Sequence, residues 1–389
     1  MSIAMLTITT TAQLADFCTD CAKHDYVTID TEFLRERTYY SKLCLIQMAY
    51  PGESEDSAVL IDVLEKSLDL GPLYDLFENK LVTKVFHAAR QDLEIFFVDR
   101  QIFPKPFFDT QVAAMVCGFG EQVGYETLVR KIAKSQLDKS SRFTDWSQRP
   151  LSDKQKAYAL GDVTHLRDIY EFLSKRLDNT NRRSWVEEEV QILTSPETYN
   201  TDPENAWRRL KNRSNSRRFL ATVQALAKFR EEYAQARNIP RNRVFKDDAL
   251  MEVAATRPKV EGDLGKSRLL LREARKGQIA EGILDAVKQA DAISNDALPA
   301  VPQIKQRPQG SEGLADLLRV LLKAKAEKAG VAQKLIASAS DLDDIAAGIG
   351  GNKIFFGWRS EVFGDDAKDL CEGRIALSAN GSSVEIIKL

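Results

Sequence analysis

The chain has 389 residues, of which 43% are hydrophobic and 29% charged, and its formal net charge is −2 at pH 7. This length predicts two or three globular domains. No uncharged run approaches the roughly 20 residues that a membrane span needs, and the chain does not open with a signal-peptide pattern, so we expect a cytoplasmic protein rather than a membrane protein. The five scattered cysteines, an odd number, suit reduced thiols.

The first informative segment is 26–33, where β-branched and aromatic residues predominate and a strand is expected. Side chains alternate between the two faces of a strand, so Asp30 and Glu32 point the same way. Two adjacent carboxylates repel each other, and a cation bound between them explains the pair. The alternative is a polar strand end without a ligand. Strands expected at 43–50 and 58–63 follow through short connections, which favours an antiparallel meander.

A second acidic residue lies at the start of a predicted helix. Residues 82–86 are predicted to form a short strand, and Asp92 stands where an apolar helix follows it. Open α/β sheets gather ligands at such strand exits. The alternative is that Asp92 only complements the dipole of the helix.

A third segment, 151–163, is predicted to be a helix with Ser152 or Asp153 as its N-cap. Tyr158 and Asp162 are four residues apart and therefore share one face of that helix, although such a pair is often an ordinary surface pair. The three segments together offer carboxylates and one phenol without a cysteine or histidine ligand set. This combination suits two magnesium ions acting on a phosphodiester, and oxygen ligands favour Mg²⁺ or Mn²⁺ over zinc.

The charge of the chain is distributed unevenly. Residues 1–204 carry 23 Lys and Arg against 33 Asp and Glu, a net charge of −10, whereas residues 205–290 carry 20 against 10, a net charge of +10. The middle block is therefore the predicted nucleic-acid grip. Its most basic stretch, 207–219, contains no acid and is flanked by aromatic residues that can stack on bases. The candidate contacts in it are Arg208, Arg209, Lys211 and Arg213. The alternative is a solvated helical face.

Proline and glycine clusters predict linkers at 195–206 and 293–313. Between the linkers, the spacing of apolar residues predicts helices at 218–236, 247–256 and 266–276. After the second linker, an apolar stripe that begins at Leu314 predicts another helical block, with further helices expected at 335–347 and 358–373.

The acidic segments resemble the DEDD exonucleases, in the branch that has tyrosine in the third motif. Asp30 and Glu32 match the first motif, Asp92 the second, and Tyr158 and Asp162 the third. The surrounding sequence resembles bacterial ribonuclease D at 31–33, 37–40, 43–47, 86–88 and 144–151. The resemblance covers most of the first 180 residues, and no motif position departs from it.

The resemblance implies an α/β plus all-α architecture. An RNase H-like, mixed-sheet exonuclease domain would occupy residues 1–195. Two small helical domains of the HRDC type, a nucleic-acid-binding module, would follow at 205–290 and 313–389, the first of them basic and the second diverged. Because the second has a nearly neutral charge, a packing or scaffold role is at least as plausible for it as a contact with RNA.

The resemblance also implies roles at the site. Asp30 would bridge two divalent ions, Glu32 and Asp162 would complete the first metal site, and Asp92 would hold the second ion directly or through water. Tyr158 would orient the attacking water. The expected substrate contacts near the site are Thr31, Phe33 and His87, and for His87 the alternative is a contact at the entry of the helix rather than a metal ligand.

We therefore expect a 3′–5′ exoribonuclease that uses two Mg²⁺ or Mn²⁺ ions and no organic cofactor, releases nucleoside 5′-monophosphates, and works as a monomer away from membranes. The expected substrates are tRNA precursors and other structured RNA 3′ ends, an expectation that rests on the resemblance alone. A DNA 3′–5′ exonuclease is an alternative, because it would use the same acids. An RNA-binding scaffold with a vestigial site is a second alternative.

Overall fold

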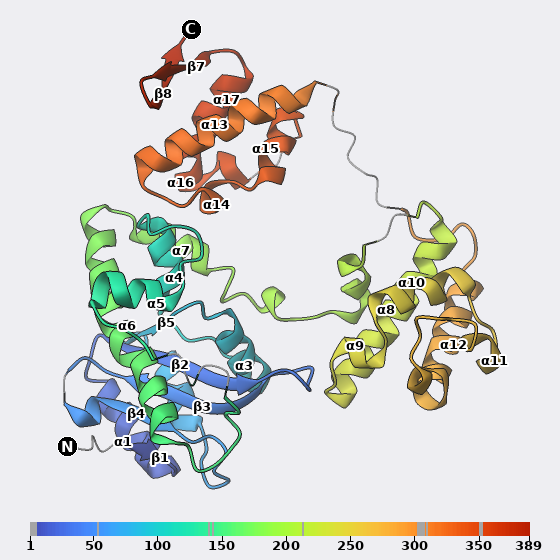
Figure 1. Ribbon diagram of the computed structural model, residues 1–389, viewed down its shortest axis with the longest axis horizontal. Helices are drawn as coiled ribbons and strands as arrows, with labels where there is room; N and C mark the ends of the chain where they lie inside the picture. The colour runs from blue at the N-terminus through green and yellow to red at the C-terminus, as the bar shows by residue number, and fades with distance from the viewer. Residues whose placement is uncertain are drawn as a thin grey trace.

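The computed structural model describes residues 6–52, 54–138, 141, 144–211, 214–301, 308, 310–349 and 353–389. Figure 1 shows three bodies in chain order: a first body of helices and strands in blue and green, a second body of helices in yellow, and a third body in orange and red. The expected combination of a mixed-sheet domain with helical domains is confirmed. Within the described part of the chain, no helix is long and apolar enough to cross a membrane.

The first body is built on a six-stranded sheet in the order β1-β4-β3-β2-β5-β6. Strands β2, β3 and β4 form the expected antiparallel meander, whereas β1, β5 and β6 run parallel to their neighbours. The strands are β1 (Thr7–Ile8), β2 (Tyr26–Leu34), β3 (Lys42–Ala49), β4 (Ala58–Ile61), β5 (Thr83–Phe86) and β6 (Phe107–Asp109).

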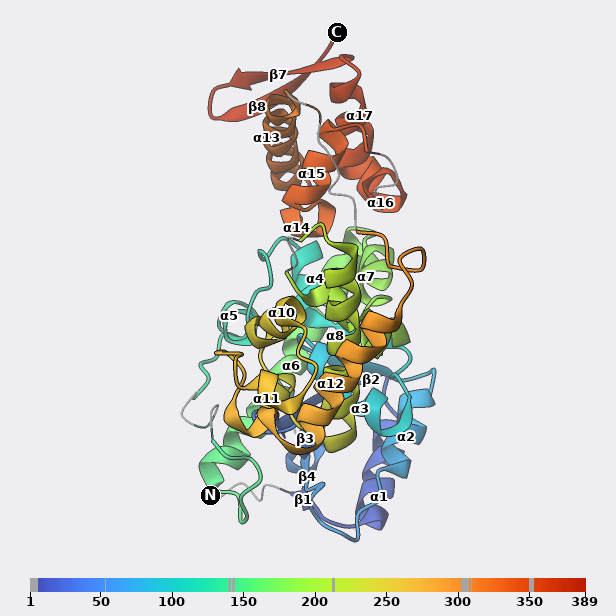
Figure 2. The same cartoon turned by 90° about the vertical axis from the view of Figure 1, so that its right-hand side faces the viewer.

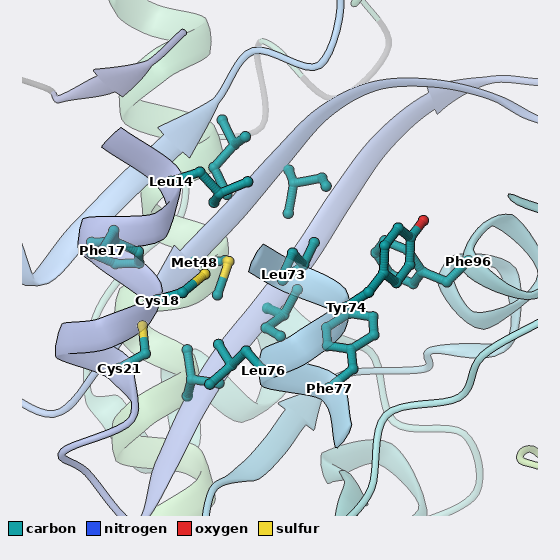
Figure 3. Packing of buried hydrophobic residues seen from close by; sticks show 14 of the residues in the cluster. Leu14, Phe17, Cys18, Cys21, Met48, Leu73, Tyr74, Leu76, Phe77 and Phe96 are labelled. Carbon is teal, nitrogen blue, oxygen red and sulfur yellow. The ribbon is translucent and has the colours of Figure 1, made fainter. Parts of the chain in front are cut away.

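Helices cover both faces of this sheet. They are α1 (Thr11–Cys21), α2 (Gly71–Glu78), α3 (Arg90–Arg100), α4 (Thr110–Val116), α5 (Tyr125–Leu128), α6 (Asp153–Asn179) and α7 (Arg183–Val190). On one face, α1, α2 and α3 bury the main hydrophobic core, whose packing around α1 and α2 is seen in Figure 3. Cys18 and Cys21 belong to this core as free thiols. On the other face, α6 packs across β2, β3 and β4.

The alternation of side chains along β2 decides what each face receives. Val27 and Ile29 enter the core beneath α1 and α2. Residues of the opposite parity, Asp30 and Glu32 among them, therefore face α6. Helix α6 begins at a capping box in which Ser152 and Gln155 satisfy each other's backbone N–H groups, so Ser152 is the N-cap, and the interpretation that gave this role to Asp153 is wrong.

The second body consists of α8 (Arg217–Arg237), α9 (Arg241–Val244), α10 (Asp247–Thr256), α11 (Glu261–Leu264) and α12 (Gly277–Ala292). The helices expected at 218–236 and 247–256 are confirmed. The helix expected at 266–276 is wrong, because only the short 3₁₀ turn Arg272–Arg275 is helical there. The third long helix of this body is instead α12, whose buried residues pack against α8.

The third body contains α13 (Ser311–Ala329), α14 (Gln333–Ile336), α15 (Ala339–Ala346), α16 (Gly357–Arg359) and α17 (Asp365–Cys371), followed by the hairpin β7 (Ile375–Asn380) and β8 (Ser383–Lys388). The expected helices are present, but the terminal hairpin was not predicted. Figures 1 and 2 show this body lying beyond α4 and α7 of the first body. There Trp185 stacks on Trp358 with 4.6 Å between ring centroids, and the buried Arg359 pairs with Glu188 and Glu189.

Two segments were expected to be linkers. In the first, 195–206, Tyr199 packs against Phe97 and Phe103 of the first body, so this stretch is anchored to the sheet domain. In the second, 293–313, residues 302–307 and 309 lie outside the described residues.

Candidate metal centre

Three carboxylates from two elements meet on the α6 face of the sheet. One oxygen each of Asp30, Glu32 and Asp162 lies within 4.8 Å of the others. Strand β2 presents Asp30 and Glu32 on one face, and α6 brings Asp162 over them. The position of α6 on the sheet is fixed next to Asp162, where the Thr28 hydroxyl donates to the Val163 carbonyl oxygen at 2.8 Å. The sequence-predicted acids of the first and third motifs are therefore brought together.

The electrostatics of the cluster favour a cation. Burial raises the pKa of Asp30 well above its ordinary value, and the negative charges of Asp92, Asp162 and Glu32 raise it further. Like charges held this close resist joint ionisation unless a positive charge compensates them. Because the three donors are carboxylate oxygens, the set fits hard divalent cations such as Mg²⁺ or Mn²⁺.

Asp92 lies in the first turn of α3 and is buried. It falls outside the three-residue cluster, although its charge acts on Asp30. The Thr31 hydroxyl, on the opposite face of β2 from Asp30, donates a hydrogen bond to the Asp92 carboxylate. Burial raises the pKa of Asp92 to about 7 despite this bond. Thr31 stays a predicted RNA contact, and its side chain is buried and bonded to Asp92.

Tyr158 lies one turn before Asp162 on α6, and both side chains line the same cavity. Burial raises the pKa of Tyr158 strongly, and the charges of Asp162, Glu32 and Asp30 add to this effect. The phenol therefore stays protonated at neutral pH in the metal-free protein, where it can donate a hydrogen bond to water.

A cavity of about 280 Å³ opens beside the carboxylates. Asp30, Tyr158 and Asp162 line it together with His87 and Tyr125. His87 contacts the Thr110 hydroxyl through Nδ1 at 2.9 Å, and burial lowers its pKa, so the ring is neutral near pH 7. The volume lies near the lower end of the range for small-ligand sites. Phe33 lies on the same strand as the acids and is partly exposed.

Asp109 is a functional candidate that the sequence analysis missed. Its buried carboxylate caps α4 by accepting from the Gln111 and Val112 amides at 2.8 and 3.2 Å. The same carboxylate accepts from the Ala88 and Ala89 amides at 3.2 and 2.9 Å, where Ala88 has a left-handed φ of 57°. This turn leads into α3 and thus into Asp92. The capping role is visible in the sequence as Asp-Thr before a helix, but the bond to a turn twenty residues away is not.

The basic segment of the second body is not one helix. Arg208 and Arg209 end a 3₁₀ turn, Pro203–Arg209, and Lys211 follows in a loop. All three side chains are exposed, and the Arg208 guanidinium lies 5.5 Å from the centre of the Trp207 ring. Arg213, the fourth predicted contact, lies outside the described residues.

The tip of the β2–β3 hairpin contacts the second body, as its path toward α9 in Figure 1 suggests. The Tyr39 hydroxyl donates to the buried carboxylate of Glu231 and accepts from Arg241 at 2.9 Å. The side-chain oxygen of Asn238 accepts from the Tyr39 and Tyr40 amides at 3.0 and 2.9 Å. The hairpin whose first strand carries Asp30 and Glu32 therefore makes polar contacts with the second body at its tip.

Comparison with known proteins identifies the family of this chain. The 3′–5′ exonuclease family matches residues 5–178, and the HRDC domain family matches residues 219–287. Ribonuclease D of Jannaschia sp. is 63% identical over 98% of this chain and 99% of its own length, and that of Granulibacter bethesdensis is 45% identical over 98% and 96%. The crystal structure of Escherichia coli RNase D, described as an exoribonuclease involved in structured RNA processing, superposes with a TM-score of 0.82 at 28% identity, covering 95% of this chain and 99% of that one. The chain therefore belongs to the ribonuclease D family of 3′–5′ exoribonucleases.

Proposed function

We propose that this chain hydrolyses the 3′-terminal phosphodiester of RNA with two divalent ions held by Asp30, Glu32, Asp92 and Asp162. The observation that carries the proposal is the convergence of three carboxylate oxygens within 4.8 Å beside a cavity that Tyr158 also lines. The products would be nucleoside 5′-monophosphates. The oxygen-only donor set supports Mg²⁺ and Mn²⁺ equally.

Each residue has a distinct task in this proposal. Bound divalent ions supply Lewis acidity at the phosphate and lower the pKa of water. The charges of the three other acids all act on Asp30, which would bridge the two metal positions, with Glu32 and Asp162 completing the first and Asp92 the second. The Thr31 hydroxyl holds Asp92, and the protonated phenol of Tyr158 orients the attacking water. Neutral His87 lines the cavity as a substrate contact.

The second body would grip the RNA. Its block of sequence carries a net charge of +10, and Arg208, Arg209 and Lys211 are exposed on it. We assign the exonuclease domain to residues 1–195, a basic HRDC domain to 205–290 and a diverged HRDC-like domain to 313–389. The proposed substrates are structured RNAs, tRNA 3′ ends foremost. Monomeric state and cytoplasmic location stay predictions.

The test uses the full chain, a 5′-labelled oligoribonucleotide and Mg²⁺. Asp30→Asn and Asp162→Asn should each abolish shortening of the labelled strand from its 3′ end while RNA binding is retained. Asp153→Asn is the matched control, because this exposed acid lies on the same helix outside the cluster. Nuclease activity that survives both substitutions would show that the site assignment is wrong. Faster degradation of a matched DNA strand than of the RNA would contradict the assignment of RNA as substrate.

A further inference from the structure

Gln47 is a buried glutamine on β3 whose amide group is unpaired. The side chain is fully buried, and neither its nitrogen nor its oxygen has a hydrogen-bond partner in the described structure. Buried polar side chains are nearly always paired in folded proteins, because an unmatched donor or acceptor loses its bonds to water without replacement. A fold that keeps such a group inside its sheet therefore needs a reason for it.

The position of Gln47 supplies one. It pairs directly with Asp30 in the antiparallel β2–β3 ladder. Directly paired residues share a face of the sheet, with about 5 Å between their Cβ atoms, so the Gln47 amide is within reach of the Asp30 carboxylate. The other same-face neighbours on β3 and β4 are Leu45, Ala49 and Leu60, all buried and apolar.

The remaining polar neighbours on β2 are diagonal to Gln47. The Thr28 hydroxyl donates toward the carbonyl oxygens of Ala49 and Val163 at 3.1 and 2.8 Å, and its oxygen does not accept from the Gln47 amide. Glu32 lies one pleat further, opposite Leu45. Of the groups around the Gln47 amide, the Asp30 carboxylate is thus the one placed directly across the ladder.

We propose that Gln47 is a positioning residue of the metal centre, whose amide N–H donates to the Asp30 carboxylate when the divalent ions are bound. This inference rests on the function proposed above. A carboxylate that bridges two ions must hold both oxygens in fixed directions, and hydrogen bonds from outside the ligand set commonly provide this. The unmatched amide would then be a feature of the metal-free protein that metal binding removes.

The proposal predicts opposite effects of one substitution on stability and on metal affinity. Gln47→Leu has similar volume and deletes both unmatched atoms, so the thermal midpoint of the metal-free full chain should rise by about 2–6 °C. The Kd for Mn²⁺, measured by calorimetry or by electron paramagnetic resonance, should increase about 10- to 100-fold. Gln47→Met should act in the same way.

Two controls separate the possible outcomes. Ser267→Ala removes another unmatched buried hydroxyl, in the second body, and should leave Mn²⁺ affinity unchanged. Mn²⁺ binding by the wild type that Asp30→Asn abolishes supports the metal centre itself, whatever Gln47 does. Mn²⁺ affinity of Gln47→Leu or Gln47→Met within about twofold of the wild type would overturn the role of Gln47, and so would a loss of metal-free stability in both variants.

Discussion

Raising the pH should destabilise the metal-free protein through Asp92, an effect that the Asp92→Asn variant removes together with the repulsion that the Asp92 charge exerts on Asp30. The folded chain keeps a proton on Asp92 up to about pH 7, whereas the unfolded chain releases it near the ordinary value of 3.8. The folded state therefore binds more protons in this interval, and the free energy of unfolding falls as pH rises, by about 1.4 kcal/mol per pH unit. Between pH 5 and pH 8 the loss from Asp92 alone is about 3 kcal/mol.

The assay is urea unfolding in the presence of a chelator at pH 5 and pH 8. Asparagine resembles the protonated acid, so wild type and Asp92→Asn should be similarly stable at pH 5, with the variant more stable at pH 8 by about 3 kcal/mol. The comparison uses the difference in unfolding free energy between the two proteins, in which the contribution of histidine titration cancels. Burial lowers the pKa of His87 and of His165, so these residues would otherwise add to the pH dependence. Saturating Mn²⁺ should restore the stability of the wild type at pH 8. A difference that does not change with pH would refute the reasoning.

Three further predictions concern residues around the site. Asp109→Asn should lower stability by roughly 1–3 kcal/mol, because its amide N–H₂ replaces one carboxylate oxygen and so faces either the Ala89 amide or the Ala88 amide without an acceptor. The variant should also lower kcat, and unchanged kcat in a folded variant would contradict the link to Asp92. Arg208→Ala combined with Arg209→Ala should weaken RNA binding and reduce the slope of the log of the binding constant against the log of the salt concentration by about 1.4. Lys288→Ala, which changes an exposed residue on α12, is the control and should leave both unchanged. Tyr39→Phe removes the hydroxyl that donates to the buried Glu231 carboxylate. The variant should lower kcat/KM for long structured RNA, but not for oligonucleotides too short to reach the second body. Equal losses on both substrates would contradict this reasoning.

The sequence predicted the site where local rules suffice. Alternation along β2 placed Asp30 and Glu32 on one face, and the helical spacing of Tyr158 and Asp162 placed them on another, because both patterns depend only on nearby residues. That these faces meet depends on packing between distant segments, and before the structure it rested on resemblance.

The sequence failed where long-range contacts decide. The bond from the Thr31 hydroxyl to Asp92 depends on the packing of α3 against the sheet and has no local signal in the sequence. Residues 266–276 have helical spacing of apolar residues, yet that segment forms a loop with one 3₁₀ turn while α12 completes the core of the second body. The roles of Asp109 and Gln47 depend on partners about twenty residues away in the chain, and neither has a local signal.

Anomalous diffraction from Mn²⁺-soaked crystals containing a short oligoribonucleotide tests the central claim most directly. The account predicts two manganese peaks bounded by Asp30, Glu32, Asp92 and Asp162, with the 3′-terminal phosphate beside Tyr158. Manganese bound elsewhere, or a 3′ end that lies away from these carboxylates, would contradict it.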